Sequence, residues 1–264
     1  MRLIVLGSGS SGNALFIEAG ATRVLVDVGL SAKETARRMS EAGIDPARLS
    51  GIVVTHEHAD HVKGVRVMSK TISAPVFISE ATRGECHFPA GGDGIHWGEV
   101  ISSSQGFQIG GLEFHPFTIP HDGVDTFAFT VQVEGVKVGI VTDLGYITQL
   151  VAERLRGCDF VMIEANHDRD MLKVGPYPWP LKQRIASNTG HLSNDEMARW
   201  MREDFDGRAA HIVLAHLSRQ CNHPELARLS ALQALDARGP SFYTDAERRI
   251  TVAHHDRATQ WFEL

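Results

Sequence analysis

The sequence predicts an α/β protein in which two mixed β-sheets are flanked by helices. Two stretches of the chain each begin with short apolar strands and continue into segments with helical periodicity. Elements in this order bury one face of a sheet against helices and the other face against a second sheet. The chain has 264 residues, of which 43% are hydrophobic, and this is enough for a sizeable core.

The first stretch contains short apolar runs that end at glycine, proline or polar residues, a pattern typical of strands. Ser31 and Glu34 have the spacing of a capping box, so we expect a helix to start there. The expected strands cover residues 2–6, 14–18, 23–27, 51–55 and 74–78, and the expected helices cover residues 35–42 and 62–69.

The second stretch begins with a β-rich region and continues as alternating helices and strands. Glu134-Gly135 is a hairpin turn signal between two of these strands. The expected strands cover residues 112–119, 126–133, 136–141, 159–163, 211–214, 241–243 and 250–252, and the expected helices cover residues 149–156, 181–187, 195–203 and 225–237. No linker separates the two stretches, so we expect one domain over residues 1–264.

Charge and cysteine content narrow the function classes. The net charge of -6 argues against a general nucleic-acid or membrane binder, although a local basic groove is compatible with it. Cys86, Cys158 and Cys221 are scattered and odd in number, so they form no disulfide framework and favour a reducing cytoplasm. No apolar run approaches the roughly 20 residues of a membrane helix, and no membrane partner is expected.

A glycine-rich loop at residues 7–12 matches the dinucleotide-binding pattern Gly-x-Gly-x-x-Gly. That pattern requires a helix to begin at the loop, whereas residues 13–18 resemble a strand, so we reject nicotinamide binding. Two interpretations stay open. The loop is a tight turn alone, or its backbone and the side chains of Ser10, Ser11 and Asn13 bind a phosphate group.

The strongest chemical signal is the run His56-Glu57-His58-Ala59-Asp60-His61, which follows a predicted buried strand. Alternate residues in a loop can point toward one ion, which suits His56 and His58. Asp60 and His61 can then turn toward a second ion. Imidazole and carboxylate are natural ligands of zinc and related divalent ions, so the run predicts a two-metal site.

This run resembles the signature of the metallo-β-lactamase superfamily, whose fold is an αβ/βα four-layer sandwich. The resemblance extends to three later residues that each follow a strand, although a lone residue of this kind is more often a cap or turn residue. It implies hydrolysis by a metal-bound hydroxide at two divalent ions, of zinc, manganese or iron. One ion would be bound by His56, His58 and His121, the other by Asp60, His61 and His216, with Asp143 bridging them.

Two further residues resemble the phosphodiesterase branch of the superfamily. There, a glutamate orients a histidine that serves as general acid to the leaving oxygen, and Glu164 and His191 match this pair. His191 could instead be a helix-flanking residue that bonds to backbone. His167 is the competing histidine, but Asp168 beside it suggests a surface loop. On this basis the catalytic residues are His191, Glu164 and Asp60.

Between residue 3 and about residue 230 the chain is similar to the YycJ (WalJ) family of bacterial cytoplasmic metallohydrolases. That similarity implies 5′-to-3′ exonuclease activity with DNA as the partner, and adds Asn222 as a substrate contact. Cys221 departs from the family, which tends to have asparagine there, and simple packing is the expected role of its thiol. Flanking basic residues add Lys182 and Arg184 as candidate substrate contacts, although a solvated surface charge is the favoured interpretation of each taken alone.

Rival functions share parts of this pattern. A ribonuclease that processes tRNA 3′ ends, a cyclic phosphodiesterase or a thioesterase would use the same metals. A non-catalytic nucleic-acid-binding module would have lost ligands, whereas all of them are present. The oxygen-reducing members of the superfamily carry a carboxylate where His58 stands, so hydrolysis is favoured over redox chemistry.

Overall fold

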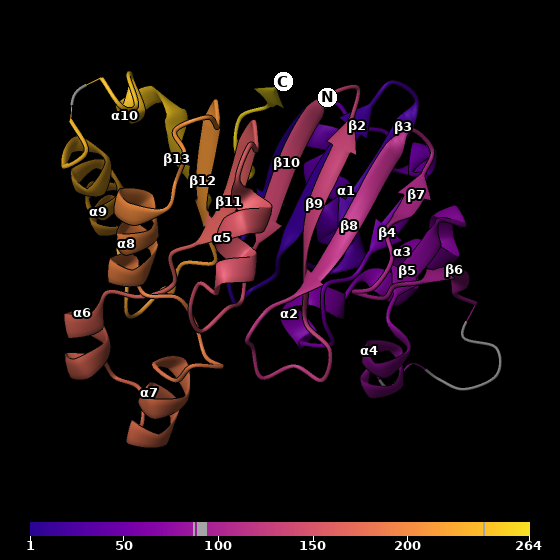
Figure 1. Cartoon of the computed structure of the whole chain (residues 1–264). Helices are drawn as coiled ribbons and strands as arrows, with labels where there is room; N and C mark the ends of the chain where they lie inside the picture. Colours follow the sequence, from indigo (N-terminus) through magenta and orange to yellow (C-terminus); the bar gives the residue numbers. More distant parts are fainter. Residues whose placement is uncertain (87, 89–93, 240) are drawn as a thin grey trace. The chain divides into compact units, whose positions relative to one another are not determined.

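The computed structural model describes residues 1–86, 88, 94–239 and 241–264 (Figure 1). Contacts between residues divide the chain into two compact units. The first contains residues 1–118, 123–135 and 254–264, and the second contains residues 119–122 and 136–253. The single domain expected from the sequence over residues 1–264 stays a prediction.

A seven-stranded sheet lies in the first unit. In spatial order it contains β14 (Phe262–Glu263), β1 (Arg2–Gly7), β2 (Ala14–Ala19), β3 (Thr22–Val26), β4 (Gly51–Val53), β5 (Pro75–Ile78) and β6 (His96–Val100). The strands from β14 to β3 are antiparallel neighbours, whereas those from β3 to β6 are parallel. Because β3 and β4 run in the same direction, the residues that follow them meet at one edge of the sheet.

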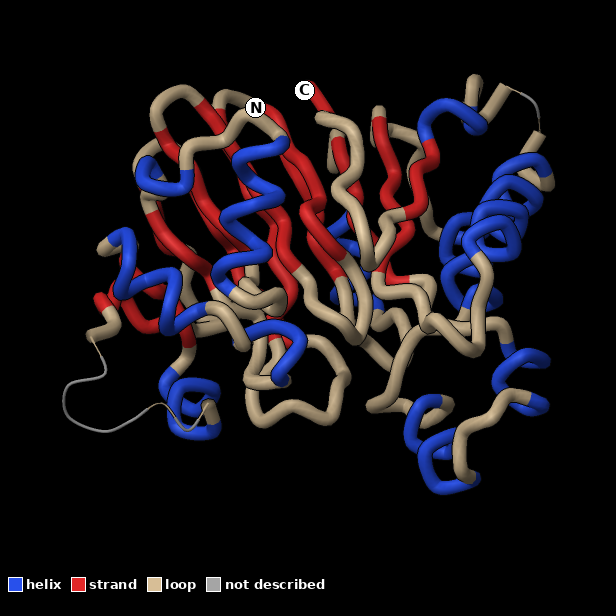
Figure 2. Tube along the Cα trace, turned by 180° about the vertical axis from the view of Figure 1, so that it is seen from behind, coloured by secondary structure: helices blue, strands red, loops and turns tan. Residues whose placement is uncertain are grey.

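Helices cover one face of this sheet, as Figure 2 shows from behind. They are α1 (Ala32–Glu41), the 3-10 turn η1 (Pro46–Arg48), α2 (Ala59–Val62), α3 (Val65–Ile72) and α4 (Glu80–Glu85). The amide of Glu34 donates to Oγ of Ser31 across 3.2 Å, which confirms the predicted cap of α1. Met39 of α1 and Met68 of α3 are buried against Phe16 and Ile52 of the sheet, so apolar burial attaches the helices to it.

Three antiparallel strands of the first unit cover the other face: β7 (Phe107–Ile109), β8 (Leu112–Thr118) and β9 (Phe127–Val133). The ring of Phe107 stacks on Phe77 of β5 with centroids 5.5 Å apart, and on Phe114 with centroids 5.1 Å apart. After β9, Glu134 and Gly135 have φ values of 49° and 83°. Positive φ at both residues is what a type I′ turn requires, which confirms the predicted turn.

The second unit contains four strands that are parallel neighbours: β10 (Val136–Val141), β11 (Phe160–Glu164), β12 (His211–Ala215) and β13 (Ile250–Val252). Its helices are α5 (Gln149–Leu155), α6 (Arg169–Val174), α7 (Trp179–Ile185), α8 (Asn194–Glu203), α9 (Pro224–Asp236) and α10 (Ala246–Arg249). Helix α8 lies beside α9 (Figure 1) and buries Met197, Trp200 and Met201. These parallel strands likewise bring the residues after β10, β11 and β12 to one edge.

The second sheet of the structure is ordered β13-β12-β11-β10-β9-β8-β7, so the described strands form two mixed sheets of seven strands. This confirms the predicted α/β class. The expected strand at residues 241–243 is wrong: this segment is a turn, and the apolar Tyr243 is buried there with its hydroxyl donating to the carbonyl of Ala209 across 2.7 Å. In the described residues no helix is both long and apolar enough to cross a membrane.

The helix expected at residues 62–69 begins later than predicted, at Val65, and Lys63 and Gly64 separate it from α2. A Cβ atom at this glycine would lie 2.4 Å from the carbonyl oxygen of Leu30, so the chain needs glycine where it passes the backbone after β3. Several short elements, among them β6, β7, α4 and α6, were not expected from the sequence because they lack a sustained period.

Candidate metal centre and acid–base pair

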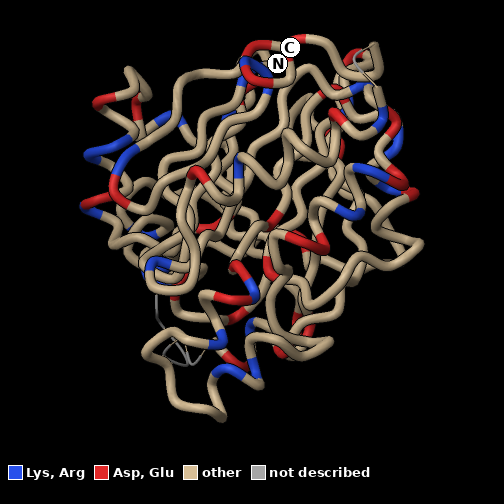
Figure 3. Tube along the Cα trace, turned by 90° about the vertical axis from the view of Figure 1, so that its left-hand side faces the viewer, with Lys and Arg blue, Asp and Glu red and all other residues tan. Residues whose placement is uncertain are grey.

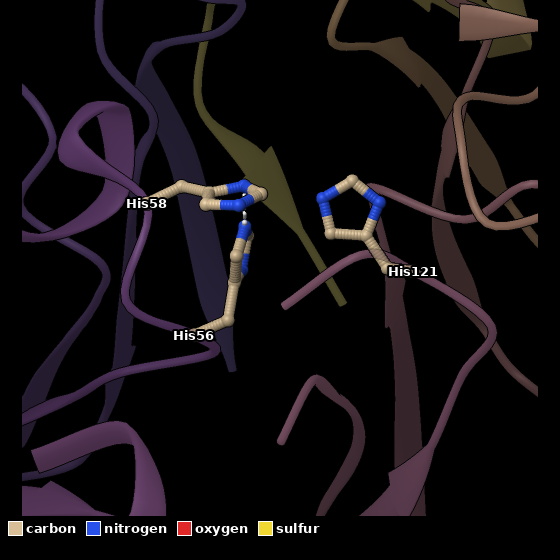
Figure 4. A group of neighbouring side chains, drawn as sticks. All are labelled: His56, His58 and His121. Atoms are coloured by element: carbon tan, nitrogen blue, oxygen red, sulfur yellow. Dashed lines mark hydrogen bonds between the residues drawn. The ribbon is translucent and has the colours of Figure 1, made fainter. Parts of the chain in front are cut away.

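The histidine run follows β4 and leads into α2. His58 is the residue that precedes α2, so Asp60 and His61 lie in its first turn. Nε2 of His56 and Nδ1 of His58 are 3.1 Å apart (Figure 4), and His56 is fully buried. Two imidazole nitrogens this close share one proton or bind one cation, and the binding of one ion by this pair stays a prediction.

A buried carboxylate holds His61. Its Nδ1 lies 2.7 Å from Oδ2 of Asp27, the residue that follows β3. Asp27 also accepts hydrogen bonds from the amide of Thr55 at 2.9 Å and from its hydroxyl at 2.8 Å. A histidine whose Nδ1 donates to a carboxylate presents Nε2 as its ligating nitrogen. Neither Asp27 nor Thr55 was identified as a site residue from the sequence; the usable signal was a polar residue directly after a strand next to β4.

The glycine-rich loop is fixed to the histidine run by Asn13. The amide of Asn13 donates to the carbonyl of Asp60 across 2.8 Å, and its side-chain nitrogen lies 3.0 Å from Nε2 of His61. Its side-chain oxygen accepts the amide of Gly9 at 2.7 Å. The loop continues into β2 and not into a helix, in agreement with the rejection of nicotinamide binding. Asn13 therefore positions the predicted ligands, and a phosphate contact by its side chain stays a prediction.

The second unit gathers four acid–base side chains where its parallel strands end. One ligand atom from each of Asp143, Glu164, His191 and His216 lies within 4.8 Å of the others. Asp143, Glu164 and His216 are buried, whereas the side chain of His191 is 21% exposed. Asp143 and His216 have φ values of 61° and 54°. Such backbone is costly for most residues other than glycine, and it occurs at turns and at functional sites.

Glu164 is the centre of this cluster. Its Oε1 lies 2.8 Å from Nδ1 of His191 and 2.9 Å from Nδ1 of His216, while its Oε2 accepts the amides of Leu144 at 2.8 Å and Leu192 at 3.1 Å. Burial by itself raises the pKa of Glu164, but the charge and hydrogen bond of His191, with the hydrogen bond of His216, outweigh it and lower this pKa to about 2. An ionised carboxylate can only accept hydrogen bonds, so both imidazoles donate to it from Nδ1. This geometry is compatible with the predicted role of Glu164 in orienting His191.

His121 is held by the same turn as His191. Its Nδ1 lies 3.0 Å from the carbonyl oxygen of Gly190, and the rings of His121 and His191 have centroids 5.2 Å apart. A Cβ atom at Gly190 would lie 2.2 Å from the carbonyl oxygen of Arg184, so the turn needs glycine at this position. The carbonyl fixes the proton of His121 on Nδ1 and leaves Nε2 as the ligating nitrogen.

The remaining predicted substrate contacts have varied environments. Ser10 and Ser11 are exposed. Nζ of Lys182 donates to the carbonyl of Lys173 across 2.7 Å, and the guanidinium of Arg184 pairs with Asp122. Their substrate contacts stay predictions.

Asn222 is buried, and its amide is fully used inside the second unit. It donates to the carbonyls of Ala165 at 2.9 Å and Asn166 at 3.1 Å, and exchanges two bonds of 2.9 Å with Asn194. This placement favours a structural role over the predicted substrate contact. The neighbouring Cys221 is buried among Leu172 and Ile185, which confirms that its thiol packs in a small core.

The donor sets of both units fit divalent ions. The first unit provides His56, His58 and His61 with Asp60, and the second unit provides the carboxylate of Asp143 with His121 and His216. His61, His121 and His216 each have Nδ1 on an oxygen acceptor, which is how proteins orient metal-binding imidazoles. Nitrogen and carboxylate donors of this kind suit zinc, manganese or iron.

Comparison with known proteins agrees with the geometry of each unit. Residues 22–217 match the family model described as a β-lactamase superfamily domain. The chain is 35% identical to exodeoxyribonuclease YycJ of Bacillus anthracis over 239 residues, which cover 90% of each chain. It is 34% identical to exodeoxyribonuclease WalJ of Streptococcus pneumoniae over 238 residues, which cover 88% of this chain and 87% of the relative. The crystal structure of the metallo-β-lactamase fold protein YhfI from Bacillus subtilis superposes with a TM-score of 0.72 at 16% identity, covering 98% of this chain and all of YhfI (100%).

Proposed function

The chain belongs to the metallo-β-lactamase superfamily of metal-dependent hydrolases, and we propose that it is a two-metal phosphodiesterase that removes nucleotides from the 5′ ends of DNA. The acid–base pair Glu164–His191 carries the phosphodiesterase part of this proposal. The names of the YycJ and WalJ relatives support the choice of DNA. The 5′-to-3′ polarity rests on the resemblance found in the sequence.

We propose seven metal ligands, in the assignment that the sequence predicts. When bound, two divalent ions would supply an activated water and would neutralise charge on the phosphate group. An oxygen acceptor on Nδ1 orients the rings of His61, His121 and His216 and sets their tautomer before any ion binds. The ligands are His56, His58 and His121 for one ion, Asp60, His61 and His216 for the other, and Asp143 between them.

His191 is the proposed general acid. Its Nδ1 donates to the ionised Glu164, so a proton on Nε2 is the one it can release to the departing oxygen. Its side chain is 21% exposed, unlike the buried Asp143 and His216, and can therefore meet a substrate. An alkoxide is a strongly basic leaving group, and a positioned acid speeds its departure by about 10²–10⁴-fold. Asp60, in α2, was also expected to be catalytic, and we propose that it acts as a ligand.

The same pair weighs against the rival hydrolases. A thioesterase expels a thiolate, whose parent thiol has a pKa near 8.5, and such a leaving group gains little from a proton donor. A binding module without catalysis would have no use for a buried ionised Glu164 that orients a histidine whose side chain is 21% exposed. Ribonuclease and cyclic phosphodiesterase activities would use the same pair, so the substrate has to be decided by experiment.

The test uses purified protein with Mn or Zn and end-labelled single- and double-stranded DNA and RNA. We expect mononucleotides to be released from 5′ ends of DNA, and His61→Ala to abolish the release because it removes a ligand. Asp45→Asn is a suitable control in the same unit, since Asp45 only caps η1. Turnover of thioesters with no cleavage of any nucleic acid would refute the proposal.

A further inference from the structure

A cavity of about 300 Å³ lies in the second unit, with His191 in its wall. Pockets for small ligands in proteins start at roughly this volume. Other wall residues are His167 after β11, Arg169 and Lys173 of α6, and Ser193 and Glu196 at the start of α8. The wall of the cavity therefore contains the proposed general acid together with polar and charged side chains that have no role in the proposed mechanism.

His167 is the residue in this wall that most needs an explanation. Its side chain is buried, and its Nδ1 has no hydrogen-bond partner in the described part of the chain. Its backbone is fixed, because it bridges to Ser193 and its carbonyl accepts the amide of Asn194 across 2.9 Å. A buried polar atom without a partner costs about 1–3 kcal/mol, and this cost bears on which ring nitrogen of His167 carries the proton.

The protonation state of His167 follows from this environment. Burial lowers its pKa to about 4, so the ring is neutral at pH 7. A neutral imidazole carries one proton, and a buried N–H without an acceptor is rarer than a buried lone pair. The proton therefore belongs on Nε2, the remaining ring nitrogen of a side chain that lines the cavity. His167 can offer a hydrogen bond to an acceptor placed there.

Arg169 and Lys173 bring cationic N–H donors to the same cavity, and Glu196 brings a carboxylate. Glu196 and Asp195 hold the guanidinium of Arg169 at 2.9 Å and 3.4 Å, and Asp170 holds Nζ of Lys173 at 2.8 Å. An arginine has five N–H donors and a lysine has three, so both retain donors for a ligand. Figure 3 shows basic and acidic positions interspersed along the described trace.

We propose that this cavity is the subsite for the terminal nucleotide that the enzyme releases. This proposal rests on the proposed function. It adds that the leaving group, which is the released nucleotide, occupies this cavity. His167 and the two basic residues of α6 would bind the 5′-phosphate of that nucleotide, which is rich in acceptors. Its 3′ oxygen would then lie toward His191.

The chemistry of cleavage is consistent with this placement. The oxygen of a water molecule forms a bond to phosphorus, and the bond between phosphorus and the 3′ oxygen breaks. The electron pair of that bond goes to the 3′ oxygen, which takes a proton from His191. The attacking water gives up one proton to the solvent, and His191 regains a proton from the solvent. The released nucleotide has a 3′ hydroxyl, and the shortened DNA carries a new 5′-phosphate that can occupy the same subsite. A cavity at the small end of ligand pockets would hold one nucleotide at a time, as cleavage from an end requires.

Binding of deoxyadenosine monophosphate to the metal-loaded protein tests the proposal by calorimetry. We expect Lys173→Ala and His167→Leu each to weaken binding by about tenfold, the range for loss of one hydrogen bond to a charged group. Arg202→Ala is the matched control, because Arg202 of α8 pairs with Glu203 and does not line the cavity. His167→Gln, which keeps an N–H donor, should retain most of the affinity. If His167→Leu does not fold, His167→Gln and Lys173→Ala still give the comparison.

A second measurement compares DNA with a 5′-phosphate and DNA with a 5′-hydroxyl. We expect the wild type to prefer the phosphorylated end in kcat/KM, and Lys173→Ala to lose most of that preference. The subsite proposal is overturned if the monophosphate does not bind, or if it binds with the same affinity to all variants, while the wild type degrades DNA. Inactivity of the wild type on DNA would instead overturn the proposed function, and the two failures are therefore distinguishable.

Discussion

Nδ1 of His61 donates to Oδ2 of Asp27 across 2.7 Å, and both side chains are buried. Because Asp27 is also held by the backbone and hydroxyl of Thr55, its carboxylate has one orientation. It therefore fixes the ring plane and tautomer of His61, and directs Nε2 toward Asn13 and Asp60. Asp27 is a positioning residue that acts through the imidazole, and it sits at φ 61°, backbone that must be stabilised by its surroundings.

Replacement of Asp27 by asparagine should weaken metal binding without unfolding the protein. The amide keeps the size of the carboxylate but loses the charge that makes His61 a stronger ligand, and such changes typically cost about 10–100-fold in metal affinity or activity. Competition with a chromophoric chelator measures the affinity. Asp45→Asn, the same change at the cap of η1, is the control. Unchanged zinc affinity in Asp27→Asn would rule out the positioning role.

The close contact between Gly29 and the backbone of Asp60 leads to a second prediction about the same ligands. A Cβ atom at this position would lie 1.5 Å from the carbonyl oxygen of Asp60, so no other residue fits without moving α2. Gly29→Ala should displace Asp60 and His61 and lower the metal affinity at least as strongly as Asp27→Asn. Gly111→Ala is the control, since its Cβ would meet no atom within 4 Å. Equal metal content in Gly29→Ala and the wild type would show that the close contact is not needed.

Much of the fold and of the ligand set could be predicted because strand ends are visible in a sequence. The segments around His56, Asp143, Glu164 and His216 each show a run of apolar residues followed by a polar one, and each lies at the end of a strand in the structure. Such local patterns depend only on neighbouring residues. The predicted turn at residues 134–135 succeeded for the same reason.

Asp27 and His167 could not be assigned from the sequence because their roles depend on distant partners. A lone aspartate after a strand is usually a turn residue, and only the pairing of β3 with β4 places Asp27 beside His61. His167 was expected in a surface loop because Asp168 follows it. In the structure Asp168 caps α6, while the ring of His167 turns into the interior. Local composition does not predict which of two adjacent polar residues is buried, and here His167 is buried while Asp168 caps a helix.

The loss of rate caused by removing His191 should increase with the basicity of the leaving group. His191→Ala is expected to slow hydrolysis of DNA by about 10²–10⁴-fold, since an alkoxide has to be protonated as it leaves. A nitrophenyl phosphodiester has a leaving group that departs without a proton, so the same variant should lose far less activity on it. Metal content measured on both proteins checks that ligands are intact. Equal losses on the two substrates would contradict the role of general acid.

The cysteines should be unreactive in the folded protein. Burial raises the pKa of Cys86 and of Cys158 to about 12, and burial also raises the pKa of Cys221. The thiolate is the reactive form, so at pH 8 a disulfide reagent should modify these thiols slowly. In guanidinium chloride all three should react at once. One rapidly modified thiol in the native protein would show an accessible thiolate that this packing does not predict.

Glu164 should make stability depend on pH in the acid range. Its pKa is about 2 in the folded protein against 4.5 as the ordinary value, so below pH 4.5 the unfolded chain binds a proton that the folded protein does not. The stabilisation that the ionised carboxylate provides is complete above pH 4.5 and is lost as the pH falls toward 2.

Urea unfolding of the chelator-treated wild type and of Glu164→Gln at several pH values measures how the free energy of unfolding depends on pH. The free-energy difference between them should shrink by up to about 1.4 kcal/mol for each pH unit of that fall, because one proton is involved. Ile163→Val, a core change on the same strand, should give a curve parallel to the wild type. If Glu164→Gln also ran parallel to the wild type between pH 5 and about pH 3, Glu164 would not be the ionised group that orients His191 and His216.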